Sequence, residues 1–466
     1  MSTTITDKST EKLENGKLLP LIFTLIIPAI ISQLITFLYN IVDRIYVSHI
    51  QDSGTDALAA LGIVLPITLI ISAFSNLIGL GGSPRASMKL GQNKQEEANT
   101  IFNNSFMMLF LLGLTISFIT FFLAENIVIL FGCPTSAIDF ATSYLKIYSL
   151  GSLFVLFSQG LNPFITALGH SFIAMISILI GAIVNIGLDP IFIYLLSMGV
   201  KGAALATIIS QAISFIWIIL FFLRKNSLFH LSFKKMIPNK KILFSIISLG
   251  FSPFIMTLTE CAIQIVFNIN LNWSTNGNSD YTAALTIMLS ALQLISLPLN
   301  GIGYGMQPFV SYNYGKGNGK RLKKGIIYAT IIAFIFGAIV YSLSMFFPII
   351  YARLFSASIE VEAIVIKYTP IFLMGTIMFF VQMTLQNINV ALGQALSALL
   401  LAVNRKVIIL IPLCFILTHF IGYEGVYFSE GITDLVAGFV TSIVFLITFP
   451  RIFKNCELQK DENQAL

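Results

Sequence analysis

Long uncharged apolar segments recur along almost the whole chain, with only short polar segments between them. A segment of about 20 apolar residues can cross the hydrocarbon core of a bilayer as one helix. Only 10% of the 466 residues are charged, whereas an ordinary soluble domain carries about 25%. The segments are too long and too uniformly apolar for the alternating strands of an outer-membrane barrel. The pattern therefore predicts an all-α polytopic membrane protein.

We expect twelve membrane spans. In the first half they cover residues 18–43, 57–82, 101–124, 138–164, 170–196 and 202–223, and in the second half 242–272, 282–310, 325–348, 360–387, 396–420 and 426–450. The polar segments between them are too short to hold a catalytic domain. No Walker A motif, catalytic triad or metal-ligand cluster is visible in the sequence. The chain is therefore expected to need no cofactor and not to be an enzyme.

The distribution of lysine and arginine predicts the orientation of these spans. If the N-terminus is cytoplasmic, most of the 27 basic residues fall on the inner side, in the N-terminal tail and in 83–100, 224–241, 311–324, 405–406 and the segment after 450. The outer side and the spans keep only Arg44, Lys146, Lys201, Arg353 and Lys367. By the positive-inside rule, both termini are then cytoplasmic in a multi-pass protein of the inner (cytoplasmic) membrane.

This orientation also gives an interpretation of two basic residues within a span and of the net charge. Arg405 and Lys406 are interpreted as anchors at the inner membrane surface. The net charge of +6 is a topology signal, and it does not indicate a nucleic-acid partner.

The chain also contains a weak copy of itself. The stretch SPRASMKLG (83–91) aligns with QPFVSYNYG (307–315), TALG (166–169) with VALG (390–393), and GVKGAALAT (199–207) with GYEGVYFSE (422–430), all at nearly the same sequence separation. Pro28 in the first span is opposite Pro253 in the seventh. Because each half holds an even number of spans, both halves have the same orientation in the membrane. Parallel repeats of this kind build transporters whose binding site lies between the halves, near the bilayer midplane.

The repeat divides the chain into two six-helix lobes. We expect a cytoplasmic N-terminal tail (1–17), an N-lobe (18–223), a basic cytoplasmic interlobe linker (224–241), a C-lobe (242–450) and a cytoplasmic C-terminal tail (451–466).

Ionisable residues inside spans are costly, at about 2.5–3.5 kcal/mol each near a helix centre, and they mark transport pathways. In the fifth span, Asn185 lies one turn before Asp189, and Pro190 lacks the N–H that would bind the carbonyl of the residue four positions earlier. A carboxylate, an amide oxygen and a free carbonyl form an oxygen-rich place for a sodium ion or a proton. The alternative is a bent helix whose aspartate is merely hydrogen-bonded to a neighbour.

Asp43 lies near the outer end of the first span, beside Arg44. Pro28 in the same helix permits a bend, so Asp43 could move with that bend. The alternative is a residue at the membrane edge that is solvated or paired locally.

The second half has acids of its own. Glu260 lies well inside the seventh span, which Pro253 is expected to bend, and Glu430 and Asp434 share one face of the last helix. In a dry site these two neighbouring acids would not both ionise, so either one is protonated or the face is wet. A substrate cavity and ordinary polar packing are both compatible with these three acids.

Several stretches resemble the multidrug and toxic compound extrusion (MATE) transporters, most closely their MepA-like bacterial branch. They are YNIVDRIYVS (39–48), DALAALGIVLPI (56–67), GLGGSPRASMKLGQ (79–92) and the region from NIGLDPIF to GVKGAALAT (185–207). The resemblance implies a two-lobe antiporter that expels cationic, often aromatic compounds in exchange for protons or sodium.

The same resemblance implies roles for single residues. Asp43, Asn185, Asp189 and Thr207 match the family's cation site, which would hold sodium or a proton. Glu260 matches an acid that the NorM-like branch uses for coupling, but the acid that this branch carries on the tenth span is replaced here by Gln382, Gln386 and Asn387. The coupling ion therefore stays open between H⁺ and Na⁺.

The sequence as a whole predicts a secondary active multidrug efflux antiporter that works by alternating access of two lobes. Its expected partners are small cationic or aromatic substrates and the lipid bilayer, and it is expected to be monomeric. The alternative is a lipid-linked saccharide flippase of the same broad architecture. Such a protein should have arginines in its central cavity, whereas the charges within these spans are mostly acidic.

Overall fold

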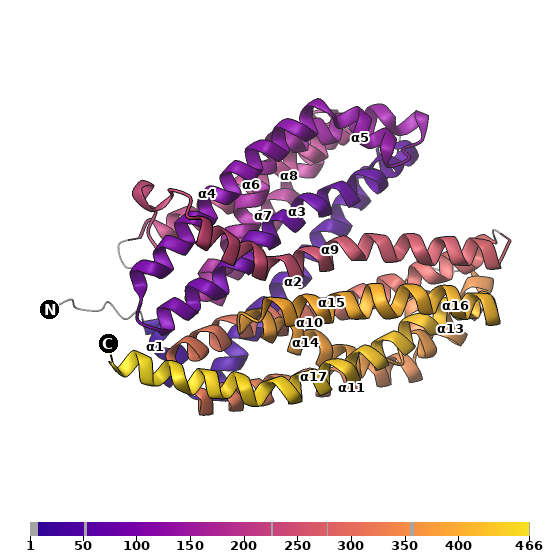
Figure 1. The fold of residues 1–466 in the computed structure, drawn as a ribbon. Coiled ribbons are helices and arrows are strands. Elements are labelled where there is room, and N and C mark those ends of the chain that lie inside the picture. Colours follow the sequence, from indigo (N-terminus) through magenta and orange to yellow (C-terminus); the bar gives the residue numbers. More distant parts are fainter. Residues whose placement is uncertain (1–7, 51–53, 225–226, 277, 355–357, 466) are drawn as a thin grey trace.

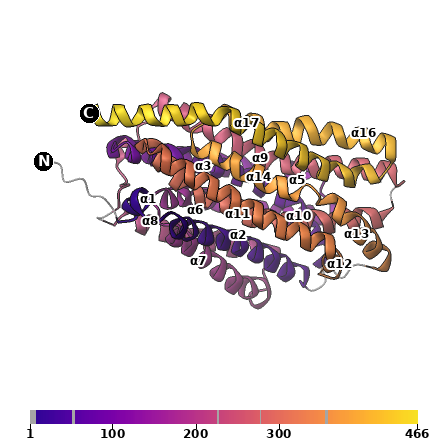
Figure 2. The same cartoon turned by 90° about the horizontal axis from the view of Figure 1, so that it is seen from below.

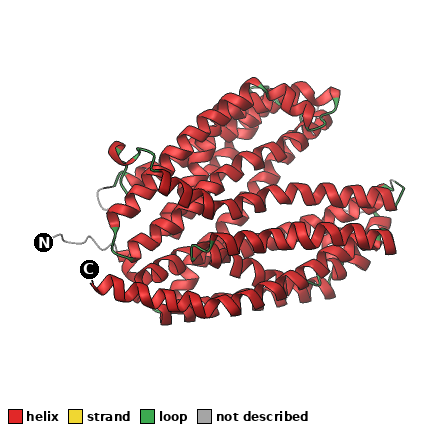
Figure 3. Ribbon diagram, viewed as in Figure 1, coloured by secondary structure: helices red, strands yellow, loops and turns green. Residues whose placement is uncertain are grey.

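The computed structural model describes residues 8–50, 54–224, 227–276, 278–354 and 358–465. In these ranges the chain is helical and forms no strand (Figure 3). The predicted all-α fold is confirmed.

The N-terminal half begins with a short helix, α1 (Lys8–Asn15), and continues with α2 (Leu18–Ser48), α3 (Gly54–Gly91), α4 (Gln95–Phe122), α5 (Ala124–Leu130), α6 (Ile138–Ala167), α7 (Ser171–Pro190), the π-helical turn η2 (Ile191–Leu195) and α8 (Val200–Phe222). The C-terminal half contains α9 (Lys240–Ser274), α10 (Ser279–Lys316), α11 (Gly319–Phe346), α12 (Ile349–Leu354), α13 (Ile359–Phe372), α14 (Thr376–Ala391), α15 (Ala395–Val403), the π-helical turn η4 (Asn404–Leu410), α16 (Ile411–Ile421) and α17 (Glu424–Ala465).

Among the described residues, eleven helical segments are long and apolar enough to cross a membrane. The pair α13 and α14, bent by 54° at the break between them, makes a twelfth if it counts as one span. The number of spans agrees with the sequence prediction. Several helices run beyond the predicted bounds because charged and polar residues continue them past the hydrocarbon, as in α17, which extends to Ala465.

The helices form two bodies that lie close together at one end and diverge toward the other (Figure 1). Figure 2 shows the same helices from below, where the two bodies overlap. The indigo-to-magenta body holds α3 to α8, and the orange-to-yellow body holds α10 to α17. Helix α1 and the last turns of α17 lie at the end where the bodies meet (Figure 1). The predicted two-lobe architecture is confirmed.

The first helix of each half begins against the opposite lobe. A Cβ atom built on Gly305 of α10 would lie only 2.8 Å from the Cα of Ile26 in α2, and one built on Gly81 of α3 would lie 2.3 Å from the carbonyl oxygen of Ile246 in α9. Such close approach is possible only with glycine. Since α2 later packs along α7 of its own lobe, it connects the two bodies.

A second pair of glycines holds the lobes together where they meet. A Cβ atom on Gly91 would lie 2.2 Å from the carbonyl oxygen of Tyr312, and one on Gly315 would lie 2.1 Å from that of Met88. These residues occupy equivalent places in the two repeat stretches, so α3 and α10 meet through a nearly symmetric contact. This contact closes the space between the lobes at the end that carries the termini.

The repeat is also visible in hydrogen bonds. Ser87 donates to the carbonyl of Ala167 at 3.5 Å, and Ser311 donates to the carbonyl of Ala391 at 2.8 Å. Both members of each pair fall in the aligned stretches of the two halves. The internal duplication inferred from the sequence is therefore expressed in equivalent contacts.

The segment between the lobes is held on α4 by asparagine side chains. Asn103 donates to the carbonyl of His230 at 2.9 Å and accepts from the backbone N–H of Ser232 at 2.7 Å. Asn104 likewise donates to the carbonyl of Lys235 and accepts from the N–H of Asn239. These amides satisfy backbone groups that have no sheet or helix partner, so the described part of the linker is bound to the first lobe.

The start of the chain is docked in a similar way. Asn313 donates to the carbonyl of Leu13 at 3.1 Å, and Arg321 donates to the carbonyls of Leu13 and Gly16 at 3.1 and 2.6 Å. Leu13 is fully buried. Helix α1 thus caps the junction of α10 and α11.

The close contact of α3 and α10 predicts an asymmetric response to two glycine substitutions. Replacing Gly315 by alanine forces a Cβ against backbone and should lower stability by about 1–3 kcal/mol, the usual cost of overpacking. Gly62→Ala in α3 is the matched control, because a Cβ there meets nothing within 4 Å, and it should be neutral or slightly stabilising. Thermal unfolding of the purified protein in detergent measures both. Equal unfolding temperatures for the two variants would contradict the close contact.

Candidate functional site

Two polar clusters lie within the membrane-spanning helices, one in each lobe. The first-lobe cluster comprises Asp43 on α2, Asn185 and Asp189 on α7, Thr207 on α8 and Tyr144 on α6. Its local backbone departs from a regular α-helix, because Pro190 ends α7 and the chain continues as the π-helical turn η2. Such turns often occur at functional sites.

The first-lobe cluster is rich in buried oxygens that accept no hydrogen bond. Asn185 and Asp189 are 2% and 0% exposed, and the Asn185 amide donates to Oδ1 of Asp189 at 3.4 Å. In the described part of the chain, Oδ2 of Asp189, Oδ1 of Asn185 and Oδ1 of Asp43 are buried and have no hydrogen-bond partner. Buried acceptors of this kind are costly unless a donor or a cation satisfies them.

These groups are close enough to act on one another. Asp43 interacts electrostatically with Asp189, and Tyr144 interacts with both acids. The hydroxyl of Tyr144 is hydrogen-bonded to Thr207, whose own hydroxyl donates to the carbonyl of Ala203 at 3.0 Å. The four residues matched through the family resemblance therefore lie together. Tyr144 was missed because a tyrosine in an apolar span carries no distinct sequence signal.

The far end of α2 is tied to the turn that follows Asp189. The hydroxyl of Tyr194 in η2 donates to the carbonyl of Tyr46 in α2 at 2.6 Å, and the two rings meet edge to face at 6.2 Å. Arg44, next to Asp43, is exposed and interacts with it electrostatically. The α2–α7 contact therefore has two ionisable acids and a tyrosine pair on one side of the interlobe space.

The second-lobe cluster comprises Glu260 on α9, Arg405 and Lys406 on η4, and Glu430 and Asp434 on α17. In an α-helix, adjacent side chains point about 100° apart. Arg405 and Lys406 are nevertheless both buried within the π-helical turn, at 5% and 2% exposure.

Arg405 joins the two acids of the last helix. It donates to Oδ1 of Asp434 at 2.7 Å and to Oε1 of Glu430 at 2.7 Å, and its guanidinium lies 4.3 Å from the ring centre of Phe379. From the sequence, we expect either that one of Glu430 and Asp434 is protonated or that both face water. The structure places a guanidinium between them and leaves them nearly inaccessible, at 3% and 1% exposure.

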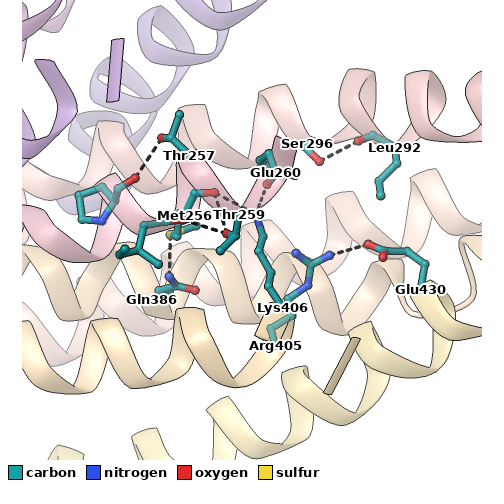
Figure 4. Close-up of polar contacts among 12 residues, drawn as sticks. Met256, Thr257, Thr259, Glu260, Leu292, Ser296, Gln386, Arg405, Lys406 and Glu430 are labelled. Atoms are coloured by element: carbon teal, nitrogen blue, oxygen red, sulfur yellow. Dashed lines mark hydrogen bonds and ion pairs between the residues drawn. The ribbon is translucent and has the colours of Figure 1, made fainter. Parts of the chain in front are cut away.

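Lys406 pairs with the remaining acid of the cluster, Glu260. Figure 4 shows its side chain directed from η4 toward Glu260, with which it forms an ion pair, and it also donates to the carbonyl of Met256 at 3.2 Å. The two partners differ in environment, because the side chain of Lys406 is 3% exposed and that of Glu260 is 61% exposed. Glu260 therefore lies at the surface of the second lobe, and its counter-charge lies beneath it.

The interpretation of Arg405 and Lys406 as inner-surface anchors is wrong. They fall well inside the span Ala395–Ile421 and are buried against acids. A physical signal was available in the sequence: two basic residues inside a span need acidic partners, and the same half carries three acids inside spans.

A cavity of about 150 Å³ adjoins Glu260. Its lining comes from α9, α10 and α14 of the second lobe and from one residue of α3: Leu80, Pro253, Met256, Thr257, Glu260, Asn300, Tyr304, Gln307, Met383, Gln386, Asn387 and Val390. Gln386 donates to the sulfur of Met256 at 2.7 Å (Figure 4). Of the three amides that stand in place of a tenth-span acid, Gln386 and Asn387 line this cavity and Gln382 does not.

The buried ion pairs predict a strong effect of removing Arg405. In Arg405→Met, Glu430 and Asp434 lose their counter-charge, which should cost about 3–5 kcal/mol of stability. Adding Glu430→Gln and Asp434→Asn to the same variant removes the uncompensated charges and should recover most of the loss. Unfolding midpoints in detergent measure both. A triple variant no more stable than Arg405→Met would contradict an electrostatic origin.

Comparison with known proteins gives a consistent result. The family model for MatE matches residues 28–191 and 242–416, which fall in the two lobes. The multidrug export protein MepA of Staphylococcus saprophyticus is 27% identical over 438 residues, covering 91% of this chain and 93% of that protein.

Solved structures share the whole fold. One is described as an outward-facing conformation of a multidrug resistance MATE family transporter of the MOP superfamily; it has a TM-score of 0.89 at 25% identity and covers 97% of this chain and 99% of its own. A MOP superfamily transporter from Pyrococcus furiosus, whose description reports reversed polarity of the binding pocket and suggests a different function, has a TM-score of 0.88 at 25% identity, with the same coverage. Because the family match extends over most of both lobes, the chain belongs to the MATE family of membrane transporters.

Proposed function

We propose that the protein is a secondary active exporter that moves lipophilic, mostly cationic compounds across the cytoplasmic membrane in exchange for protons or sodium ions. In this proposal both termini are cytoplasmic, so the diverging ends of the lobes face outward. Support comes from the family, from relatives named as multidrug export proteins and from the distribution of lysine and arginine in the sequence.

The observation that carries the proposal is the set of unpartnered buried oxygens on Asp43, Asn185 and Asp189. A carboxylate pair with an amide oxygen suits a sodium ion, since hard cations prefer oxygen ligands, and a proton would also relieve the repulsion between the two acids. Either cation would be the exchanged substrate. Thr207 and Tyr144 would complete the polar surroundings.

The position of α2 suggests how cation binding reaches the lobes. Its first part lies against α10 through Ile26 and Gly305, and its last part lies beside η2 through Tyr46 and Tyr194. Pro28 lies in the first part, where its missing N–H weakens the helix and permits bending. A cation bound between Asp43 and Asp189 would draw the last part of α2 toward α7, while its first part stays packed on the second lobe.

This movement provides alternating access. Bending α2 changes the wall of the interlobe space and would disfavour a bound organic cation, so cation and cargo are exchanged rather than held together. Pro190 and Pro253 are proposed as further bending points. Differential affinity of the two states for the cation and the cargo is what allows one to drive the other.

A lipid-linked saccharide flippase, the alternative function, would need free basic side chains in its central cavity. Arg405 is bound by Glu430 and Asp434, and Lys406 by Glu260. These mid-span cations are therefore not free to hold an anionic headgroup, which favours cationic and aromatic cargo over a lipid-linked saccharide.

The proposal predicts that Asp189→Asn strongly slows gradient-driven transport. Ethidium transport is followed in proteoliposomes with a proton gradient and a sodium gradient imposed separately. The gradient that drives transport identifies the coupling ion. Asn keeps the shape but removes the titratable, cation-binding charge, so the rate should fall at least about tenfold, a loss of roughly 1.4 kcal/mol.

Asp139→Asn is the matched control, because Asp139 is exposed at the start of α6; it should transport like the parent. Undiminished transport by folded Asp189→Asn protein would refute the cation site. Failure of the parent to respond to either gradient would refute the antiport itself.

A further inference from the structure

The cavity beside Glu260 has one charged residue in its lining, and the cation that pairs with this carboxylate, Lys406, lies outside the lining. The other lining residues supply amides, methionines, a threonine hydroxyl, a tyrosine and aliphatic groups. A second contact holds the ammonium group in place, because Lys406 also donates to the carbonyl of Met256 and is almost completely buried. Lys406 is thus a built-in cation next to the group that would otherwise attract a cationic substrate.

We propose that Lys406 is a specificity-determining residue: by neutralising Glu260 it makes the second-lobe cavity a subsite for an uncharged aromatic group and leaves cationic groups to the first-lobe acids. This inference rests on the proposed export function and assigns a part of the substrate to each lobe.

A cationic ligand at Glu260 would compete with Lys406 for the carboxylate. A positive group that approaches Glu260 meets a carboxylate whose charge is already offset by Lys406, and if it displaced Lys406 the ammonium would be buried without its counter-charge. Leaving a buried ammonium unpaired in this way is strongly unfavourable. Arg405 cannot replace Lys406 as the partner of Glu260, because it is paired with Glu430 and Asp434. The cavity therefore disfavours a positive group although an acid lines it.

The size and chemistry of the lining fit a neutral ring. A cavity of about 150 Å³ accepts a ligand the size of benzene. Met256 and Met383 supply adaptable apolar contacts that are favourable with aromatic rings. Gln307 is 6% exposed, and its amide nitrogen has no hydrogen-bond partner among the described residues, so the cavity also offers a donor to a polar substituent or to the face of a ring.

The test uses two water-soluble probes that share one aromatic ring and differ in charge, phenyltrimethylammonium and benzenesulfonate. Their binding to the purified full-length protein in nanodiscs is measured by equilibrium dialysis, with protein-free nanodiscs as the blank. Lys406→Met uncovers Glu260, so the affinity for phenyltrimethylammonium should rise at least tenfold and that for benzenesulfonate should fall. Glu260→Gln leaves the ammonium unpaired and should produce the opposite shift.

Two further variants control for structure. Lys406→Arg keeps the charge and should behave like the parent, and the double variant Lys406→Met/Glu260→Gln should lose the charge preference that each single change creates. An unchanged cation affinity in Lys406→Met, or a reduced cation affinity in the double variant relative to the parent, would overturn the inference, because the second result would mean that Glu260 already binds the cation directly. If Lys406→Met does not fold, the double variant decides, because its affinity for phenyltrimethylammonium should equal that of the parent only if Lys406 already neutralises Glu260.

These measurements need no ion gradient. A parent protein that fails to transport ethidium would refute the proposed function while leaving the binding shifts intact. Conversely, gradient-driven transport with no binding shift in the variants would refute only the role of Lys406.

Discussion

The low-dielectric interior of the membrane requires every ionisable side chain in a span to find a partner, and the two lobes meet this requirement in different ways. In the second lobe, Arg405 holds Glu430 and Asp434, and Lys406 holds Glu260. In the first lobe, buried oxygens of Asp43 and Asp189 accept no hydrogen bond in the described part of the chain. The second-lobe cluster thus has two bases for its three acids, and Oε2 of Glu430 is also buried without a hydrogen-bond partner among the described residues. The first lobe instead has an oxygen-rich cluster suited to an external cation.

The difference between the two lobes is visible at equivalent positions of the internal repeat. Thr207 and Glu430 are at equivalent ends of the aligned stretches GVKGAALAT and GYEGVYFSE. The first belongs to a cluster of neutral hydroxyls and acids on α6, α7 and α8, whereas the second binds the guanidinium of Arg405. Equivalent helix packing, as in the Gly91 and Gly315 contacts, therefore coexists with different chemistry at equivalent positions.

Much of this could be predicted from the sequence, because hydrophobic length and repeat spacing are strong signals in a membrane protein. The twelve spans, the two lobes and the acids inside the spans follow from such patterns. The pairing of Arg405 and Lys406 was not predicted, because both were placed at the membrane surface although basic residues inside a span need acidic partners. No local sequence pattern marks the π-helical turn in which both are buried. The bound linker was also unforeseen, because the asparagines of α4 gain meaning only when residues 228–239 lie against them.

The central claim is that cation and cargo compete at the first lobe, while the ion-paired acids of the second lobe take no part in this coupling. Its most direct test is the release of protons or sodium ions when ethidium is added to purified protein in weakly buffered detergent solution, followed with a pH electrode and a sodium electrode. Release should persist in the Lys406→Met/Glu260→Gln variant and disappear when Asp43 and Asp189 are both replaced by asparagine. Release that survives the loss of the first-lobe acids and vanishes with the second-lobe pair would contradict the claim.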